Sequence, residues 1–481
     1  MREMIVVNLV GGFRRTPFIV AFAIVFLPML CVVGHTYGVT LEHAVAGRST
    51  RCGTDVIPRI FHRAALLPDG RVMVTGGLGL TLSPVGLTSL RDISTFDPAS
   101  REFSTPHAID GSAPLRLIKG RGCHTMTTLL DDRVLITGGN VGARERISGR
   151  LDPSTELIDL NSLKVQPGPD MNEPRAYHTA TRLSEGRVLL AGGKSWQLFD
   201  PTQDAFSDPV AMVRSRSRHA AVLLPAEHPS LSDRVLVIGG LGSGGRWLEI
   251  LDPALMASRQ LQAPLPRDVN DLSAVRLANG RVLIVGGQVN SSLQTTTYVG
   301  VFDPVDESLR ELPPIPDREH GISDNELIAL GKYAVVFGGE QQVGREDTEL
   351  DYIAIFNGES ERWEFVGAML QPRDDFAAVR IDDERVLLID GAYSKFGAEA
   401  PTATSEMFEL LDVLLGDMNH DGAVTSPDVG RFVRVLLAPD EANAIEFRAA
   451  DLNSDLVVDQ RDIMPFQKRL MGVADDARDL P

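Results

Sequence analysis

The hydrophobic pattern of the chain is a short apolar run, closed by a pair of glycines, that returns many times. The runs read VMVT, VLIT, VLLA, VLVI, VLIV, AVVF and VLLI. A strand with one solvated face would alternate apolar and polar residues, so these continuous runs predict strands that are buried on both faces. The glycines that follow indicate places where crowded backbones leave no room for a Cβ atom.

The run occurs seven times at nearly regular intervals. The first residue of the closing pair is Gly76, Gly138, Gly192, Gly239, Gly286, Gly338 and Asp390. The spacing lies between 47 residues (Gly192 to Gly239) and 62 residues (Gly76 to Gly138). Strand-rich repeats of about 40–50 residues are typical of β-propellers, in which every repeat forms one blade. The sequence therefore predicts a mainly β fold with seven blades.

Each repeat contains the parts of a four-stranded blade. A first strand and a tight turn, such as Asp69-Gly70, precede the buried run. A third strand ends at a turn such as Phe96-Asp97-Pro98, and a short fourth strand follows, marked in the first copy by Phe103. The pattern resembles the kelch repeat family over residues 50–412, and the resemblance implies a seven-bladed kelch-like β-propeller of antiparallel blades. Two copies depart from it, with Tyr333 in place of arginine and Asp390 in place of glycine.

The seventh repeat shows only three strands before the composition changes. We expect residues 39–45, or another segment just before the first repeat, to supply its fourth strand and close the ring. A free sheet edge would otherwise invite aggregation.

The N-terminal segment predicts export. Arg14 and Arg15 precede an apolar run over residues 18–33, and Ala44-Val45-Ala46 follows, as in a secretory signal. A retained membrane anchor is the alternative, because the run is near the lower length of a spanning helix. We assign residues 1–46 to a signal peptide or anchor, 47–411 to the propeller and 412–481 to a second domain. The expected location is extracytoplasmic, either secreted or at the cell surface.

Composition narrows the class of partner. The chain has 481 residues, 43% of them hydrophobic and 23% charged, with a formal net charge of −18. This balance argues against a nucleic-acid partner, which needs a basic surface. Cys52 and Cys123 would be the cysteines left after removal of Cys31 with a leader; they are a possible disulfide, or two buried thiols.

The second domain contains two calcium-binding patterns. Calcium prefers six to eight oxygen ligands, and a twelve-residue loop supplies them from positions 1, 3, 5, 7 and 12, with a backbone carbonyl at position 7. The first loop offers Asp417, Asn419, Asp421, Ala423 and Asp428, and the second offers Asp451, Asn453, Asp455, Val457 and Asp462. Each loop leads into an apolar helix. Gly422 provides the turn at position 6 of the first loop, whereas Leu456 stands there in the second, which predicts a strained and weaker second site.

This tandem resembles the type I dockerin family over residues 416–472, because Asp rather than Glu fills position 12 and the opening reads Gly-Asp-x-Asn-x-Asp-Gly. The resemblance implies two calcium ions, calcium-dependent folding and docking onto a cohesin-type partner. It places partner recognition at Ser426, Pro427, Gln460 and Arg461. Ordinary paired EF-hands are the alternative for this domain.

Evidence for catalysis in the repeats is weak. His62, His124, His178 and His219 precede the first strands of four copies, and their recurrence favours a structural role over a metal or ligand site. Asp324, Asp374 and Asp375 are candidate carboxylates for glycoside hydrolysis, which needs two facing acids. No combination of tyrosine, cysteine and histidine indicates a copper-radical oxidase.

These patterns favour an exported propeller that binds an unknown ligand, glycans included, and is tethered by its dockerin-like module. The alternative is a dockerin-bearing carbohydrate-active enzyme, a hydrolase or oxidase in polysaccharide breakdown. The sequence leaves open whether any catalysis occurs.

Overall fold

A computed structural model describes residues 43–471, except 83–84, 110, 112, 142–149, 226–230, 345 and 396–397. All of these residues belong to one compact unit. Residues 1–42 of the predicted leader, with its apolar run and Cys31, lie outside the described residues. Within the described ranges, no helix has the length and apolar character needed to cross a membrane.

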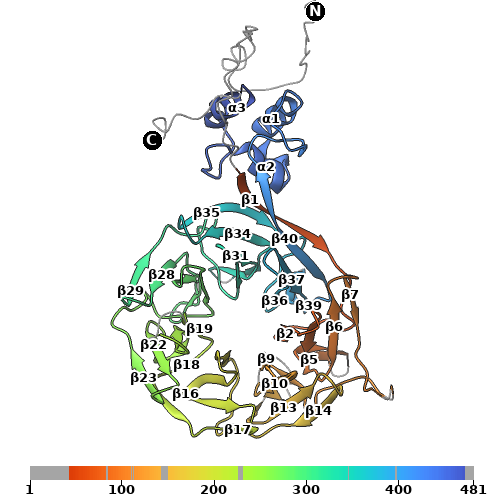
Figure 1. Cartoon of the computed structure of the whole chain (residues 1–481), viewed down its shortest axis with the longest axis vertical. Coiled ribbons are helices and arrows are strands. Elements are labelled where there is room, and N and C mark those ends of the chain that lie inside the picture. Colours follow the sequence, from red (N-terminus) through yellow and green to blue (C-terminus); the bar gives the residue numbers. More distant parts are fainter. Residues whose placement is uncertain are drawn as a thin grey trace, which may run out of the picture. The chain divides into compact units, whose positions relative to one another are not determined.

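Seven antiparallel blades are arranged in a ring, as Figure 1 shows. From the innermost strand outward, the blades contain β2 (Arg63–Leu66), β3 (Val72–Thr75), β6 (Ile93–Asp97) and β7 (Glu102–Ser104); β9 (Thr125–Thr128), β10 (Arg133–Thr137), β13 (Thr155–Asp159) and β14 (Lys164–Pro167); β15 (Thr179–Arg182), β16 (Val188–Asp200) and β17 (Ala205–Phe206); β19 (Ala220–Leu223), β20 (Val235–Ile238), β22 (Leu248–Asp252) and β23 (Ala257–Gln260); β25 (Ser273–Arg276), β26 (Val282–Val285), β28 (Val299–Asp303) and β29 (Ser308–Glu311); β30 (Glu326–Leu330), β31 (Tyr333–Phe337), β34 (Tyr352–Asn357) and β35 (Arg362–Ala368); and β36 (Ala377–Arg380), β37 (Arg385–Ile389), β40 (Ser405–Leu414) and β1 (His43–Arg51).

The continuous apolar runs are buried on both faces, as the sequence predicted. All four residues of β26 are fully buried. Val282 and Ile284 belong to the hydrophobic cluster shared with the preceding blade, whereas Leu283 and Val285 belong to the cluster shared with the following blade. Each run therefore packs between two neighbours, which explains why it contains no polar face.

The ring is closed by a segment that precedes the first repeat. β1 pairs with β40 from His43 opposite Leu414 to Arg51 opposite Glu406. Each innermost strand contacts the next one around the channel, including β2 with β36. The expected closing strand is thus present, although it begins at His43, inside the segment assigned to the leader, and β40 continues to Leu414, beyond residue 411.

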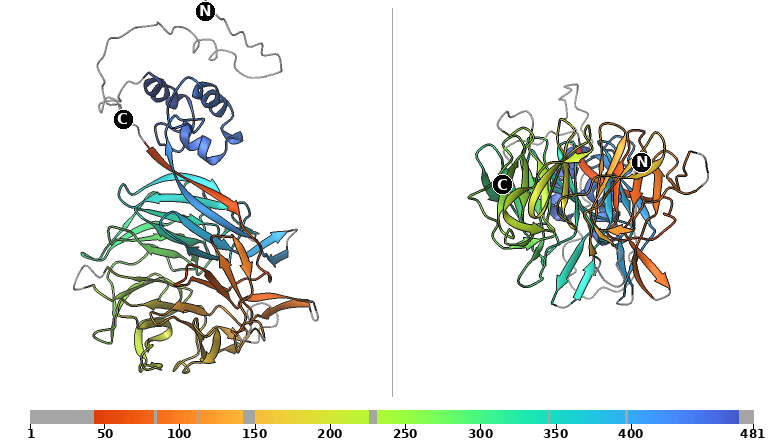
Figure 2. Two further views of the ribbon diagram at one scale, coloured as in Figure 1. Left: turned by 45° about the vertical axis from the view of Figure 1, so that its right-hand side comes forward. Right: turned by 90° about the horizontal axis from the view of Figure 1, so that it is seen from below.

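Short extra strands decorate the connections between blade strands. They are β4 (Leu78–Leu82), β5 (Val85–Ser89), β8 (Arg121–Gly122), β11 (Asn140–Val141), β12 (Arg150–Leu151), β18 (Val210–Ser217), β21 (Leu241–Gly242), β24 (Val269–Asn270), β27 (Gln288–Val289), β32 (Glu340–Val343), β33 (Glu346–Glu349), β38 (Ala392–Lys395) and β39 (Ala398–Pro401). Three hairpins, β32–β33, β38–β39 and β4–β5, project from one face of the ring in the right-hand view of Figure 2 and contact one another in that order.

The helices lie in the C-terminal segment. They are α1 (Asp428–Leu437), η1 (Pro439–Glu441), α2 (Ala444–Ala450), η2 (Gln460–Asp462) and α3 (Ile463–Leu470). Phe432 of α1 and Phe466 of α3 stack with ring centroids 4.0 Å apart. Val435 is buried in α1, whereas Val433 of the same helix is 43% exposed.

The sequence did not predict α2, and this helix joins the C-terminal segment to the propeller. It contacts β1, β35 and β40. Ala449 and Met418 belong to the same buried cluster as Val45 of β1 and Phe365 of β35. The C-terminal segment therefore shares a hydrophobic core with the strands that close the ring.

Candidate functional site

A buried arginine recurs four residues before the first residue of five innermost strands. The set is Arg59, Arg121, Arg175, Arg216 and Arg373, and each is 3% exposed or less. Each guanidinium donates to the carbonyl of the first residue of its own blade's closing pair, for example Arg216 to Gly239 at 2.8 Å. Each also meets a carboxylate at 2.6–3.4 Å, namely Asp55, Glu156, Glu173, Glu249 or Glu406.

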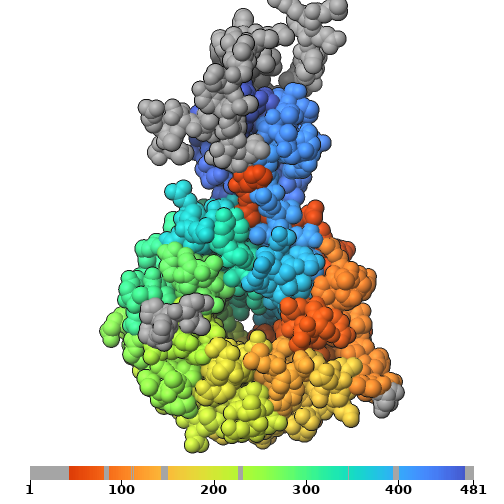
Figure 3. Space-filling model, in the orientation of Figure 1, coloured from red at the N-terminus to blue at the C-terminus, as the bar shows by residue number. Residues whose placement is uncertain are grey.

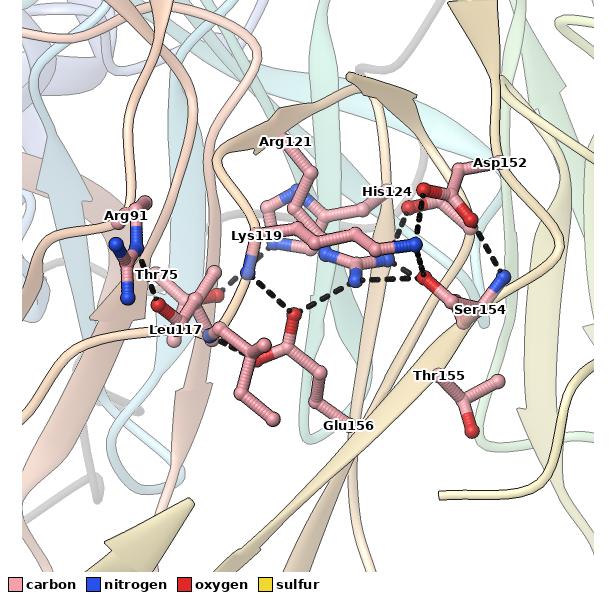
Figure 4. Close-up of polar contacts among 12 residues, drawn as sticks. Thr75, Arg91, Leu117, Lys119, Arg121, His124, Asp152, Ser154, Thr155 and Glu156 are labelled. Carbon is pink, nitrogen blue, oxygen red and sulfur yellow. Dashed lines mark hydrogen bonds and ion pairs between the residues drawn. The ribbon is translucent and has the colours of Figure 1, made fainter. Parts of the chain in front are cut away.

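Figure 4 shows one of these networks in the second blade. Arg121 lies 2.7 Å from Glu156, and both side chains are excluded from solvent. Glu156 also accepts from the backbone amides of Ile118 and Lys119. A buried charge of this kind needs its partners, because an unpaired ion in the interior is expensive. These residue pairs tie the strands of a blade together, so they belong to the scaffold.

The histidines connect neighbouring blades. The Nε2 atom of His124 lies 2.9 Å from the Thr75 hydroxyl of the preceding blade, and that of His178 lies 2.8 Å from Thr137. His219 makes the same kind of contact with Thr179, at 3.0 Å. Burial lowers the pKa of His219 to about 3 and those of His124 and His178 well below the ordinary value. The structure thus gives these neutral side chains the structural role expected from their recurrence.

Asp390 fills the place of the first glycine in the seventh blade. Its backbone keeps the left-handed conformation, with φ of 52°, and its side chain is fully buried. One carboxylate oxygen lies 3.6 Å from Nε of Arg59. Burial, and then the nearby Asp55 carboxylate, raise the pKa of Asp390 well above its ordinary value. The departure therefore adds a second acid to the network around Arg59.

A ring of seven residues surrounds the channel where the innermost strands begin. The ring contains Phe61, Cys123, Tyr177, Arg218, Asp271, Asp324 and Asp375, one from each blade, and all have left-handed φ values between 48° and 55°. Six backbone hydrogen bonds of 3.0–3.2 Å join neighbouring members, as from Cys123 N to Phe61 O. The space-filling view in Figure 3 shows an opening at the centre of the propeller. Because the ring combines five residue types, no sequence motif revealed it.

Side chains of the ring contact one another across blades. Arg218 lies 2.8 Å from Asp271, and its guanidinium carbon is 4.2 Å from the centre of the Tyr177 ring. Phe61 meets Tyr177 edge to face, at 6.0 Å between centroids. These residues, with Asp324 and Asp375, line a cavity of about 310 Å³. Of the candidate carboxylates, Asp324 and Asp375 therefore share a cavity, whereas Asp374 is buried beside it and is not in its lining.

The cysteines do not form the disulfide that the sequence allowed. Cys52 and Cys123 are both free and buried. Cys123 belongs to the channel ring beside Tyr177, and burial raises the pKa of its thiol to about 11. Cys52 instead packs among Val72, Val74 and Met407, between the first and last blades. The two thiols lie in different parts of the propeller, and each is a buried side chain without a disulfide partner.

The two loops of the C-terminal segment share one hydrogen-bond pattern. In the first, Asp417 accepts from the backbone amides of Asp421 and Gly422, at 3.2 and 2.8 Å. In the second, Asp451 accepts from Asp455 and Leu456 at 3.1 and 3.2 Å. The repeated pattern gives both loops the same course around their first acid.

The acid at position 12 also has the same place in both loops. Asp428 accepts from the amides of Asn419 and Thr425, and Asp462 from those of Asn453 and Asp459. Both carboxylates are fully buried. Each carboxylate therefore accepts hydrogen bonds from the backbone amides of positions 3 and 9 and so connects the two ends of its loop.

The oxygen chemistry of both loops suits calcium. Carboxylates, an asparagine amide and a backbone carbonyl are hard donors of the kind that calcium takes. Across the described residues, no three His, Cys, Asp or Glu side chains are already gathered around a metal position. Each loop contains three acids, at positions 1, 5 and 12, so its donors would have to draw together when an ion binds. Burial raises the pKa of Asp451 to about 6, which marks a carboxylate that a bound cation would stabilise.

The residues expected to recognise a partner are all exposed. Ser426 and Pro427 precede α1, and Gln460 and Arg461 form the start of η2. Arg461 lies 2.7 Å from Asp455 and 2.9 Å from Asp459. The two pairs stand at matching places before Asp428 and Asp462.

Comparison with known domains identifies the family of the C-terminal segment. Residues 415–471 match the dockerin type I domain. The C-terminal segment is a dockerin type I domain. Such domains bind calcium and in general bind cohesin partners, and they are typically extracellular.

The propeller is similar to curated kelch-domain and Adagio proteins. Kelch domain-containing protein 9 of Mus musculus is 24% identical over 63% of this chain and 77% of its own length. Adagio-like protein 1 of Oryza sativa subsp. japonica is 24% identical over 64% of this chain and 51% of its own length. Adagio protein 3 of Arabidopsis thaliana is 28% identical over 43% of this chain and 34% of its own length. The chain spans about half or less of the Adagio proteins that it matches. The fold is thus a seven-bladed kelch-like propeller with a dockerin domain.

Proposed function

We propose that this protein is an exported binding protein whose propeller is tethered to a cohesin-type partner by its dockerin domain. The observation that supports this most directly is the matched pair of loops, in which Asp417 and Asp451 accept the same backbone hydrogen bonds. The propeller contributes a rigid ring with decorated connections, a surface suited to recognition.

In this proposal each loop binds one calcium ion. The ligands are Asp417, Asn419, Asp421, the Ala423 carbonyl and Asp428 in the first, and Asp451, Asn453, Asp455, the Val457 carbonyl and Asp462 in the second. Calcium supplies the charge that balances these acids and so stabilises the loops between helices. Ser426, Pro427, Gln460 and Arg461 would then present two similar surfaces to the partner.

Calcium titration of the full chain by calorimetry tests the metal sites. We expect two ions to bind, and we expect Asp428→Ala and Asp462→Ala each to remove one. Asp440→Ala is the matched control, because Asp440 is exposed in η1 and outside both loops. A wild-type chain that binds no calcium would overturn the proposal.

Capture on immobilised cohesin domains tests the partner. We expect a cohesin to retain the full chain in calcium and to release it in chelator, and the double variant Asp428→Ala, Asp462→Ala to pass through. Retention that is equal in calcium and chelator, or absent on every cohesin of a broad panel, would contradict the tether.

Polysaccharide hydrolysis is the second candidate, because Asp324 and Asp375 line one cavity. The binding role is favoured because the volume of that cavity, about 310 Å³, is at the lower end of the range for ligand sites and is small for a polymer. Loss of a measured hydrolase activity in Asp375→Asn would favour the enzyme.

A further inference from the structure

The channel cavity is the space lined by Phe61, Tyr177, Arg218, Asp271, Asp324, Asp375 and their neighbours at the start of the innermost strands. Its volume is about 310 Å³, and blades one, three, four, five, six and seven contribute to its walls. That size suits a small molecule and is too small for a folded partner.

The ionisable groups of the cavity are unbalanced. Its carboxylates are Asp271, Asp324, Glu326 and Asp375, and its cations are Arg63 and Arg218. His178 and His219 also line it, but their lowered pKa values keep both rings neutral. Four carboxyl groups thus face two arginines. Burial raises the pKa values of Asp271, Asp324 and Glu326, so these acids are poorly compensated by the cations of the wall.

The two arginines are already engaged in the protein. Arg218 pairs with Asp271 at 2.8 Å and stacks on Tyr177, and Arg63 donates to the His62 carbonyl at 3.0 Å. Asp271 in turn hydrogen-bonds Asp324. Both arginines therefore already have partners inside the wall.

Acceptors, in contrast, are left over. The carboxylate of Glu326 accepts no hydrogen bond from any described residue, although burial raises its pKa to about 7. Asn325 is only 7% exposed and lines the same cavity. Its side-chain nitrogen donates to Ser273 at 2.6 Å, while its side-chain oxygen has no partner among the described residues. A buried polar atom without a partner is costly, and a ligand that donates hydrogen bonds would remove that cost.

We propose that the channel cavity binds a small organic cation, whose ammonium or guanidinium group donates to Glu326, Asp324 and the side-chain oxygen of Asn325. Arg218 shows the same chemistry within the chain, since its guanidinium sits between a carboxylate and an aromatic ring. A metal ion fits less well, because the described acids do not gather in a group of three around one point. This binding is independent of the dockerin domain.

The test is calorimetric titration of the full chain in saturating calcium with agmatine, which has a guanidinium and an ammonium group. Glucose and acetate serve as neutral and anionic probes. We expect agmatine to bind, and Glu326→Gln and Asp324→Asn each to weaken it about ten-fold or more, the loss expected for one charge-assisted hydrogen bond. Thermal unfolding checks that both variants are folded.

Glu185→Gln is the control, because Glu185 is an exposed acid in a blade turn and its loss removes one negative charge, as the two test substitutions do. We expect it to leave agmatine affinity unchanged. Three results would overturn the proposal: agmatine binding weaker than roughly 1 mM, equal weakening in the control variant, or preferential binding of glucose or acetate.

Discussion

Leu456 adopts the left-handed backbone conformation that Gly422 adopts at the same place in the first calcium loop, with φ values of 65° and 88°. A residue with a Cβ atom is disfavoured there by about 1–2 kcal/mol, whereas glycine is not. The strain expected from the sequence is therefore present in the second loop. It survives because the hydrogen bonds to Asp451 and Asp462 hold the loop in this course.

We expect Leu456→Gly to raise the thermal stability of the dockerin domain by about 1 kcal/mol, less any packing lost from the half-buried leucine. Circular dichroism at 222 nm of the full chain measures this, because the described helices lie in that domain. Gly422→Ala is the matched control and should destabilise, since a Cβ atom at Gly422 meets nothing within 4 Å and the backbone alone decides its effect. A lower midpoint for Leu456→Gly would contradict the strain.

The ion pair of Arg121 with Glu156 offers a second test. Arg121→Met should cost about 3–5 kcal/mol, because it leaves Glu156 buried without its cation. Denaturant unfolding followed by tryptophan fluorescence gives the change in the free energy of unfolding. Arg187→Met in the exposed pair with Glu185 should cost less than about 1 kcal/mol. Similar losses in both variants would argue against a scaffold role for the buried set.

His62 and His124 occupy the same place in successive blades but differ in their partners. His124 bonds the Thr75 hydroxyl, whereas no side chain of the described residues bonds a ring nitrogen of the buried His62. Leu272 holds this place in the fifth blade. We therefore expect His62→Leu to leave the thermal midpoint unchanged or raise it, and His124→Leu to cost about 1–3 kcal/mol by leaving the Thr75 hydroxyl unpaired. Equal effects of the two substitutions would show that the threonine bond is unimportant.

The blades could be predicted because their packing repeats in the sequence. Residues 282–285 must all be apolar because they fill the interfaces with two neighbouring blades, and every copy of the repeat has an apolar run at this place. The histidines were visible for the same reason. Arginine was equally regular at the place three residues before each of these histidines and before Phe376, at Arg59, Arg121, Arg175, Arg216 and Arg373. Yet a charge beside a strand resembles a surface residue. Its burial is visible only together with its carboxylate partner. That partner lies 33–35 residues later for Arg121, Arg216 and Arg373 but within four residues for Arg59 and Arg175.

The channel ring and α2 could not be predicted for different reasons. The ring is a backbone feature, so Phe61, Arg218 and Asp324 occupy equivalent places without sharing any chemistry. α2 is short, and it is stabilised by packing against β1, a strand that lies some 400 residues earlier in the chain. Isolated helices of this length are unstable in water, so their formation depends on tertiary contacts that a local pattern does not contain.

Glu326 should make the stability of the propeller depend on pH. Burial raises its pKa in the folded state from 4.5 to about 7, and Arg63 offsets part of this effect. Below pH 4.5 the carboxyl is protonated in both states, so its contribution to stability is fully present. As the pH rises toward 7 the unfolded chain loses the proton while the folded protein keeps it, and stability falls. Glutamine does not titrate, so the thermal midpoint of Glu326→Gln should rise relative to that of the wild type as the pH increases from 4.5 to 8. Parallel midpoint curves for the two proteins across this range would show that Glu326 ionises as freely in the folded channel as in the unfolded chain.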